Sequence, residues 1–375
     1  MNVGILGAGQ LGRMLALAGY PLGLRFRFLD PDRAAPAGRL ADLVVGDYED
    51  ADALRRFADG LDVATYEFEN VPATVADLLD GRVPAVHPHY AALAAAQDRL
   101  VEKTTFRRLG IPTAPFEPID SRDDLVRAVD ALALPAVLKT RRLGYDGKGQ
   151  FVLRDAADVD RAWTALGGSP LILEGFVAFE RELSILAVRG RDGDVAFYPL
   201  VENVHREGIL RRSIAPAPGV PPALQSRAEA YARAVLEAFD YVGVLAIELF
   251  QRGDELLASE MAPRVHNSGH WTIEGAETSQ FENHLRAICG MPLGSTALRG
   301  PTAMLNIIGT IPDRDAILAV PGAHLHLYDK TPRPGRKLGH ITVRERDLAA
   351  VSAHLAAIEA LVEAPGAHET PGRRP

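Results

Sequence analysis

The sequence contains a single cysteine, Cys289, among its 375 residues. One cysteine excludes a disulfide framework within the chain and a zinc site built from cysteines, and it fits a reducing compartment. Basic residues are outnumbered by acidic ones, 41 to 49, which argues against a nucleic-acid partner because such surfaces usually carry a basic excess. The chain also lacks a signal peptide and any apolar run of membrane-span length. We therefore expect a soluble, cytoplasmic protein with no nucleic-acid or membrane partner.

The most informative stretch is a predicted β-hairpin that ends close to a cluster of polar residues. An apolar run, Val242–Phe250, and a shorter one, Leu256–Met261, flank a polar turn at residues 251–255. Each run contains one acid, Glu248 or Glu260, and the two are equidistant from position 254. In a regular hairpin these like charges would face each other, which is unfavourable unless something compensates them. A Mg²⁺ ion would do so, whereas the alternative is a surface hairpin with solvated acids.

A glycine-rich loop follows the first predicted strand, residues 2–6. Gly7, Gly9 and Gly12 have the spacing of a dinucleotide-binding turn, in which Gly9 would let a phosphate approach the backbone at a helix N-terminus. A second predicted strand ends at Asp30, 18 positions after Gly12, as that fingerprint requires. The motif alone is compatible with NAD, with another phosphate ligand, or with a purely structural turn.

Strands and helices continue to alternate through the first half of the chain. The predicted strand 63–68 runs into Glu69, which lies where open α/β sheets bind ligands but equally suits a helix cap. The basic residues of a predicted helix over 97–109, Arg99 and Lys103 among them, are typical of a solvated face. Residues 111–120 hold three prolines and are predicted to be a linker.

Two features in the middle of the chain suggest phosphate recognition. Lys139 ends a short apolar strand, where a lysine either extends its amine to solvent or reaches a phosphate. The loop Gly144–Gln150 has three glycines and a lysine, which suits a mobile lid whose backbone N–H groups cradle phosphates. It is not a Walker A loop, and a plain hairpin turn would also explain it.

These features, in this order, resemble the ATP-grasp superfamily. The segments GxGQLGRM, GYDGKGQ, APRVHNSGHWT, HLHLYDK and RPGRKLGH, spread over residues 4–340, are similar to the branch that carboxylates an imidazole ribonucleotide in purine biosynthesis. The resemblance implies an α/β (α+β) fold in three parts. These are a Rossmann-like N-terminal domain over 1–95, a split ATP-grasp unit with its lid over 96–292, and a small C-terminal domain over 293–375 with a disordered tail.

The resemblance also implies ATP and Mg²⁺ as cofactors. Glu248 and Glu260 would carry the metal, and the family commonly has asparagine where Ser259 stands. The residues implied to contact ATP are Arg99, Lys139, Gly144, Tyr145, Asp146, Gly147, Lys148, Gly149, Gln150, Glu174, Gly175, Phe176, Val177, Glu182, His205, Ser259 and Glu260.

The implied reaction is the ATP- and bicarbonate-dependent carboxylation of the amine of aminoimidazole ribonucleotide, by way of carboxyphosphate. Arg264, His266 and Lys139 would be catalytic, with His266 either removing a proton or positioning substrate. The residues implied to bind the ribonucleotide are Gln10, Leu11, Glu69, Tyr145, Asp146, Arg264, His266, Asn267, Ser268, Lys330, Arg336 and Lys337.

The resemblance further implies a homodimer that is functionally coupled to the mutase that uses its product. Two rival classes remain open on the residues alone. An NAD-dependent dehydrogenase would explain the glycine loop but not the lid, the acidic hairpin or the basic segment at 330–337. A non-catalytic nucleotide-binding protein would be free to lose the lysine and both glutamates.

Overall fold

The structure is a computed structural model that describes residues 1–363 except 73, 80 and 145–148. Its first sheet is parallel, in the order β3-β2-β1-β4, and confirms the predicted Rossmann-like start. Its strands are β1 (Asn2–Leu6), β2 (Arg25–Asp30), β3 (Asp42–Val45) and β4 (Val63–Tyr66). The elements connecting and following them are α1 (Gln10–Gly19), η1 (Tyr20–Leu22), η2 (Pro36–Arg39), α2 (Ala51–Ala58), α3 (Thr74–Leu79), α4 (Tyr90–Ala96) and α5 (Arg99–Arg108). Asp50 caps the N-terminus of α2, because its side chain accepts hydrogen bonds from the N–H groups of Asp52 and Ala53.

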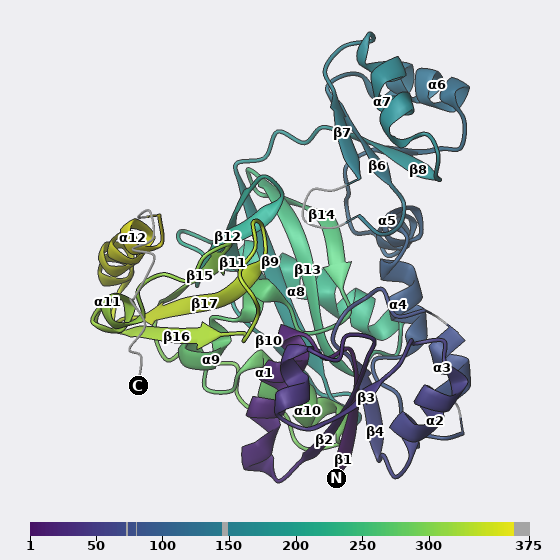
Figure 1. Cartoon of the computed structure of the whole chain (residues 1–375). Helices are drawn as coiled ribbons and strands as arrows, with labels where there is room; N and C mark the ends of the chain where they lie inside the picture. Colours follow the sequence, from purple (N-terminus) through teal and green to yellow (C-terminus); the bar gives the residue numbers. More distant parts are fainter. Residues whose placement is uncertain (73, 80, 145–148, 364–375) are drawn as a thin grey trace, which may run out of the picture.

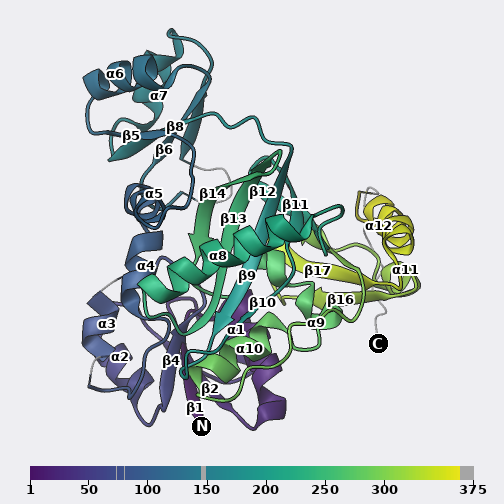
Figure 2. The same ribbon diagram turned by 180° about the vertical axis from the view of Figure 1, so that it is seen from behind.

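A second, antiparallel sheet forms a lobe that projects from the rest of the molecule (Figures 1 and 2). Its order is β5-β8-β6-β7. The elements are β5 (Phe116–Ile119), α6 (Arg122–Leu132), β6 (Ala136–Thr140), β7 (Gln150–Leu153), α7 (Asp158–Leu166) and β8 (Leu171–Gly175). The linker prediction for residues 111–120 is therefore wrong at β5. This strand tolerates Pro118 because it lies at the sheet edge, where a missing N–H breaks no ladder.

The largest sheet is antiparallel and has nine strands, ordered β14-β13-β9-β11-β12-β15-β17-β16 with β10 beside β9. Its strands are β9 (Arg181–Arg189), β10 (Val195–Phe197), β11 (Val201–Arg206), β12 (Ile209–Ala215), β13 (Gly243–Arg252), β14 (Glu255–Ala262), β15 (Thr302–Ile308), β16 (Ala323–Leu327) and β17 (Lys337–Arg344). The helices around it are α8 (Pro222–Ala238), η3 (Asn267–Gly269), α9 (Thr272–Gly275), α10 (Gln280–Ile288), α11 (Arg314–Leu318) and α12 (Leu348–Glu363). Strands β15, β17 and β16 thus extend this largest sheet, the central sheet of the molecule, through the β12–β15 pairing. Among the described residues, no helix is long and apolar enough to cross a bilayer.

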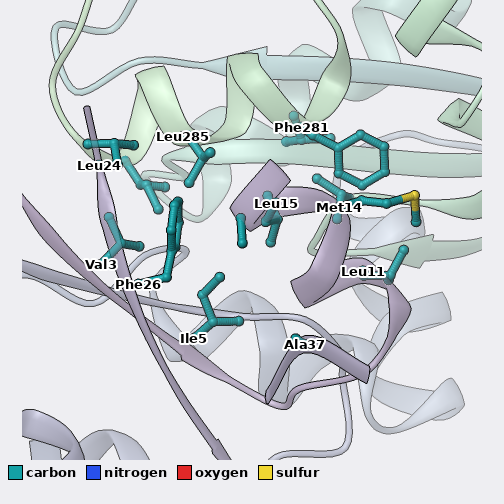
Figure 3. Close-up of a cluster of buried hydrophobic side chains, with 14 of the residues drawn as sticks. Val3, Ile5, Leu11, Met14, Leu15, Leu24, Phe26, Ala37, Phe281 and Leu285 are labelled. Atoms are coloured by element: carbon teal, nitrogen blue, oxygen red, sulfur yellow. The ribbon is translucent and has the colours of Figure 1, made fainter. Parts of the chain in front are cut away.

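The glycine loop is anchored to the central sheet through a buried apolar cluster. Figure 3 shows Leu15 of α1 between Ile5 and Phe26 of the first sheet and Leu285 of α10. The same cluster includes Val244 of β13. The start of α1 and the acidic hairpin therefore share one core, which fixes their relative positions.

The acidic hairpin, β13–β14, contains the predicted pairing, although not by the predicted route. Near the turn, Arg252 pairs with Glu255, a register that would place Ser259 opposite Glu248 if it continued. A β-bulge shifts the register by one residue between Glu248 and Leu249, and Glu248 then pairs with Glu260. The assumption of a regular hairpin was wrong, and the opposition of the two acids is confirmed.

Candidate active site

A cavity of about 630 Å³ lies where the three sheets converge. It collects residues from the first glycine loop, the projecting lobe, the acidic hairpin and the segment after β16. The residues predicted for the site that line it are Gln10, Leu11, Glu69, Arg99, Lys139, Gly144, Gln150, Glu182, His205, Glu248, Ser259, Glu260, Arg264, His266, Asn267, Lys330 and Lys337. Positions up to 328 apart in the sequence, Gly9 and Lys337, therefore share one cavity.

Glu248 and Glu260 form the acidic centre of the cavity. Burial, reinforced by the charge of Glu260, holds the pKa of Glu248 well above its usual range. Arg99 approaches Glu260 with 3.4 Å between Nη1 and Oε2. No group of three or more metal-ligating side chains occurs in the described part of the chain. Two facing carboxylates nevertheless suit Mg²⁺, which takes its remaining ligands from substrate phosphates and water.

Magnesium binding at this pair should strengthen as the pH rises. The raised pKa of Glu248 means that below it the carboxyl carries a proton, which the ion must displace. Ionising Glu248 also destabilises the metal-free fold, since its folded pKa exceeds its unfolded one. We expect the Mg²⁺-induced rise in melting temperature to grow between pH 6 and pH 9, measured by thermal unfolding with and without MgCl₂. A shift that is flat or shrinks with pH would contradict the assignment, and the double variant Glu248→Gln, Glu260→Gln should show no shift.

A second cluster of charged side chains consists of one buried carboxylate and two lysines that contact it. Glu174 Oε2 lies 2.9 Å from Lys139 Nζ and 3.4 Å from Lys103 Nζ. Burial opposes ionisation of Glu174, but the two lysines outweigh it and hold its pKa at about 2. The other carboxylate oxygen, Oε1, is buried and has no hydrogen-bond partner among the described residues.

Lys103 corrects the prediction that the basic residues of this helix face solvent. Its side chain is 1% exposed and points inward to Glu174. Arg99, on the same helix, also turns into the cavity, where its Nη2 donates to the Gly144 carbonyl at 3.3 Å. The sequence signal that could have revealed this is the spacing 99 and 103, which places both residues on one face of a helix.

Glu182 and His205 form a third pair on neighbouring strands β9 and β11. His205 Nδ1 lies 2.5 Å from Glu182 Oε2. Burial would lower the pKa of His205, but the hydrogen bond to Glu182 and the charge of Glu248 raise it. The imidazole is thus biased toward the cationic form, which suits contact with phosphates.

Beyond the acidic pair, the cavity contains an ion pair between residues from distant segments. Arg264 Nε donates to Glu69 Oε2, and both were predicted to contact the acceptor substrate. His266 lies beside it, with Nε2 3.4 Å from Glu248 Oε1. Arg264 and His266 therefore lie between the acidic centre and the part of the cavity lined by the glycine loop.

The glycine loop binds a carboxylate of the protein itself. Glu67 accepts hydrogen bonds from Gly9 N at 2.5 Å and from Gly12 N at 2.7 Å. A Cβ at Gly9 would lie 2.4 Å from the Glu67 carboxylate, so this glycine is needed for the close approach of that side chain. Asp30 accepts from Ala8 N at 2.8 Å. The position that a dinucleotide pyrophosphate would take is filled, and the dinucleotide interpretation is wrong.

Removing the Glu67 carboxylate should destabilise the protein. The variant Glu67→Ala leaves the N–H groups of half-buried Gly9 and buried Gly12 without their acceptors, which costs about 2–4 kcal/mol for the two together. Glu67→Gln, which keeps the shape and one acceptor oxygen, is the matched control and should lose less. Chemical denaturation measures both, and equal stabilities for wild type and Glu67→Ala would refute the capping role.

Several predicted residues lie outside the cavity lining. Arg336 is half-buried, and its Nη1 donates to the Thr331 carbonyl. The described predicted residues that are not among those lining the cavity are Gly149, Glu174, Gly175, Phe176, Val177, Ser268 and Arg336. Tyr145, Asp146, Gly147 and Lys148, like the predicted tail after Pro365, lie outside the described residues.

Some cavity residues were missed by the sequence analysis. Glu102 is buried close to Glu260, and burial, reinforced by that charge, raises its pKa to about 8. Lys330 Nζ donates to Gln10 Oε1, which ties the 330s segment to the start of α1. The lining residues that were not predicted include Glu67, Glu102, Arg141, His270 and Tyr328. Glu67 had the same signal as Glu69, since both follow strand β4.

Two sheets that enclose charged side chains, with a strand lysine from one and an acidic hairpin from the other, define an ATP-grasp enzyme. Family models match accordingly: the ATP-grasp domain over residues 104–281, the ribonucleotide synthetase preATP-grasp domain over 1–97, and the phosphoribosylaminoimidazole carboxylase C-terminal domain over 302–354. The chain belongs to the N5-carboxyaminoimidazole ribonucleotide synthase family of ATP-grasp ligases.

Individual relatives match nearly the whole chain. The N5-carboxyaminoimidazole ribonucleotide synthase of Pseudomonas aeruginosa is 55% identical over 364 residues, which cover 97% of this chain and 100% of the relative. The crystal structure of the Thermus thermophilus synthetase has a TM-score of 0.93 at 61% identity and covers 96% of this chain and 98% of its own. The Aspergillus clavatus synthase, solved with ADP and 5-aminoimidazole ribonucleotide, has a TM-score of 0.90 at 34% identity and covers 96% and 98%.

Proposed function

We propose that this protein carboxylates the amine of 5-aminoimidazole ribonucleotide, using ATP and bicarbonate, to give 5-(carboxyamino)imidazole ribonucleotide in purine biosynthesis. The observation that carries the proposal is the continuity of the cavity. The Arg264–Glu69 and His266–Glu248 contacts lie between an acidic centre suited to Mg-ATP and the start of α1. The relative from Aspergillus clavatus, which binds ADP and the ribonucleotide, supports the same division.

The first stage is the phosphorylation of bicarbonate to carboxyphosphate. Lys139 and Arg99 supply positive charge close to the transferred phosphoryl group, where such charge stabilises the transition state. Glu248 and Glu260 would hold Mg²⁺, which neutralises phosphate charge when bound. Arg264, which lines the cavity, would hold bicarbonate and then the acyl phosphate, because its guanidinium matches planar carboxylates.

The second stage transfers carbon to the ribonucleotide amine. The exocyclic nitrogen attacks the carboxyl carbon of carboxyphosphate as the C–O bond to the phosphate breaks and inorganic phosphate leaves, or it attacks carbon dioxide that the same cleavage has released. The nitrogen loses one proton and the carbamate forms. Lys330 and Lys337 bring positive charge to one end of the cavity, which suits the phosphate of the ribonucleotide. Arg336 would join them from the same segment.

The remaining site assignments follow from the family and are part of the proposal. The lid over Gly144–Gln150 would cover the phosphates, Glu174–Val177 would pass the adenine edge, and Glu182 would bind the ribose. Tyr145, Asp146 and Asn267 would complete the acceptor site, and Ser268, which was expected to bind the substrate directly, would act through His266 because it is buried behind that side chain. We infer domain boundaries at 95/96 and 292/293, a cytoplasmic homodimer, and coupling to the mutase that uses the product.

Phosphate release from Mg-ATP tests the proposal. We expect strong stimulation by aminoimidazole ribonucleotide that depends on added bicarbonate. Hydrolysis that is indifferent to the ribonucleotide would keep the ATP-grasp class but overturn the acceptor. Absence of hydrolysis under every condition would overturn the activity itself.

A further inference from the structure

A chain of buried polar side chains runs across the central sheet to His266. Ser213 Oγ lies 2.7 Å from Asn203 Oδ1, and Asn203 Nδ2 lies 3.0 Å from Ser184 Oγ. Ser184 Oγ is 2.8 Å from Ser268 Oγ, which in turn lies 2.9 Å from His266 Nδ1. The four residues before the histidine are 0–4% exposed and come from β12, β11, β9 and η3.

The direction of this chain is fixed at the histidine end. The backbone N–H of Ser268 donates to His266 Nδ1 at 3.3 Å, and a backbone N–H can only donate, so Nδ1 is an acceptor. The Ser268 hydroxyl must then donate to the same nitrogen and accept from Ser184. Ser184 must in turn accept from the amide of Asn203, whose oxygen accepts from Ser213. Every hydrogen bond therefore points toward the imidazole.

A neutral imidazole whose Nδ1 is an acceptor carries its proton on Nε2. That nitrogen lies 3.4 Å from Glu248 Oε1, and the His266 side chain lines the cavity. The atom that faces the reacting groups is thus an N–H donor with no lone pair available for a proton. A general base needs an available lone pair directed at the proton it removes.

We propose that Ser268, Ser184, Asn203 and Ser213 are positioning residues that lock His266 as an Nε2–H hydrogen-bond donor. The proposal rests on the proposed function and refines it. His266 donates to an oxygen of the Glu248 carboxylate or of the carboxyl group being transferred, and the proton of the ribonucleotide amine leaves to another acceptor. The buried hydroxyl chain exists because the reaction needs the histidine in one tautomer.

The tautomer can be measured on the full-length protein without any substrate. In ¹⁵N-histidine-labelled wild type, the resonance of His266, identified by its loss in His266→Gln, should show the pattern of a neutral ring protonated on Nε2. A pattern with the proton on Nδ1 overturns the proposal. This spectrum does not depend on activity, so a protein without ribonucleotide-dependent turnover would refute the proposed function and leave the tautomer assignment standing.

Two substitutions at position 266 distinguish whether His266 acts as a hydrogen-bond donor or as a general base. The side-chain amide of His266→Gln can donate from about the place of Nε2, so we expect kcat within about tenfold of wild type. His266→Ala provides no donor, and its kcat should fall at least about a hundredfold. A glutamine variant as inactive as the alanine variant would contradict the donor role.

The chain of hydrogen bonds from Ser213 to Ser268, which relays its direction to His266, is tested by replacing a donor in it with an acceptor. Asn203→Asp replaces the amide donor with an acceptor, so Ser184 and then Ser268 must turn their hydroxyls away from the ring. We expect the proton of His266 to move to Nδ1 in the spectrum and kcat to fall about tenfold. In Ser268→Ala the shorter hydroxyl contact is lost while the backbone N–H at 3.3 Å still donates to Nδ1, so the proton should distribute between Nδ1 and Nε2. An unchanged tautomer in folded Asn203→Asp overturns the relay; if that variant does not fold, a proton that stays fully on Nε2 in Ser268→Ala does so instead.

Discussion

Replacing Glu260 by glutamine will abolish turnover of Mg-ATP while leaving the fold intact. Glutamine has the size and shape of glutamate but lacks the charge that, with Glu248, is expected to hold the metal ion. Loss of a metal ion that stabilises transferred phosphoryl charge removes several kcal/mol, so kcat should fall by about a thousandfold or more. Steady-state phosphate release at saturating ATP, bicarbonate and ribonucleotide measures the effect.

The same substitution should not destabilise the metal-free protein. Glu260 lies opposite Glu248 and raises its pKa, so removing one charge relieves that repulsion. This gain offsets the lost contact with Arg99, and the melting temperature without Mg²⁺ should stay close to that of wild type. Glu255→Gln is the matched control, because this acid lies on the same hairpin but is 64% exposed and paired with Arg252. Near-normal turnover in Glu260→Gln would exclude the metal assignment.

Replacing Arg264 by glutamine will remove ribonucleotide-dependent phosphate release and also weaken the fold. Arg264 is 15% exposed, and its guanidinium donates to Glu69. Burial disfavours the charged form of Glu69, but Arg264 outweighs it and lowers the pKa of that carboxyl. Breaking a buried ion pair by removing one partner costs about 3–5 kcal/mol, because the other charge is left uncompensated.

A double variant separates the structural role of Arg264 from its chemical one. In Arg264→Gln, Glu69→Gln both charges are gone, so a large part of the lost stability should return in denaturant unfolding. Activity should stay at least about a hundredfold below wild type, since the group proposed to hold the carboxyl being transferred is still missing. Recovery of both stability and turnover in the double variant would show that Arg264 has only a structural role.

The sequence was sufficient for features that depend on local pattern. The β1–loop–α1 unit follows from residue spacing and turn chemistry, whereas the expected pairing of Glu248 with Glu260 depends on a β-bulge that the sequence did not reveal. It was insufficient where a distant segment decides the outcome. The glycine loop has the composition of a phosphate site, and only the folded chain places Glu67, 55 positions after Gly12, against its amides.

Burial of charge was the other property that the sequence did not reveal. Lys103 lies in helix α5, whose polar face favours solvent exposure. Its amine instead forms a buried ion pair with Glu174, a residue of strand β8 in the projecting sheet. The proline-rich stretch around β5 is similar, because its identity as an edge strand depends on β8, which lies more than 50 residues away. Secondary-structure propensity is a weak guide where pairing with a distant strand compensates for residues that disfavour a strand.

The most direct test of the whole account is the fate of bicarbonate oxygen. With [¹⁸O]bicarbonate, Mg-ATP and aminoimidazole ribonucleotide, the account predicts that one ¹⁸O atom enters each phosphate released, because carboxyphosphate forms when a bicarbonate oxygen attacks the γ-phosphorus. Phosphate that carries no label while the ribonucleotide is consumed would contradict the account, since ATP would then be cleaved by water and the carboxylation would not pass through this intermediate.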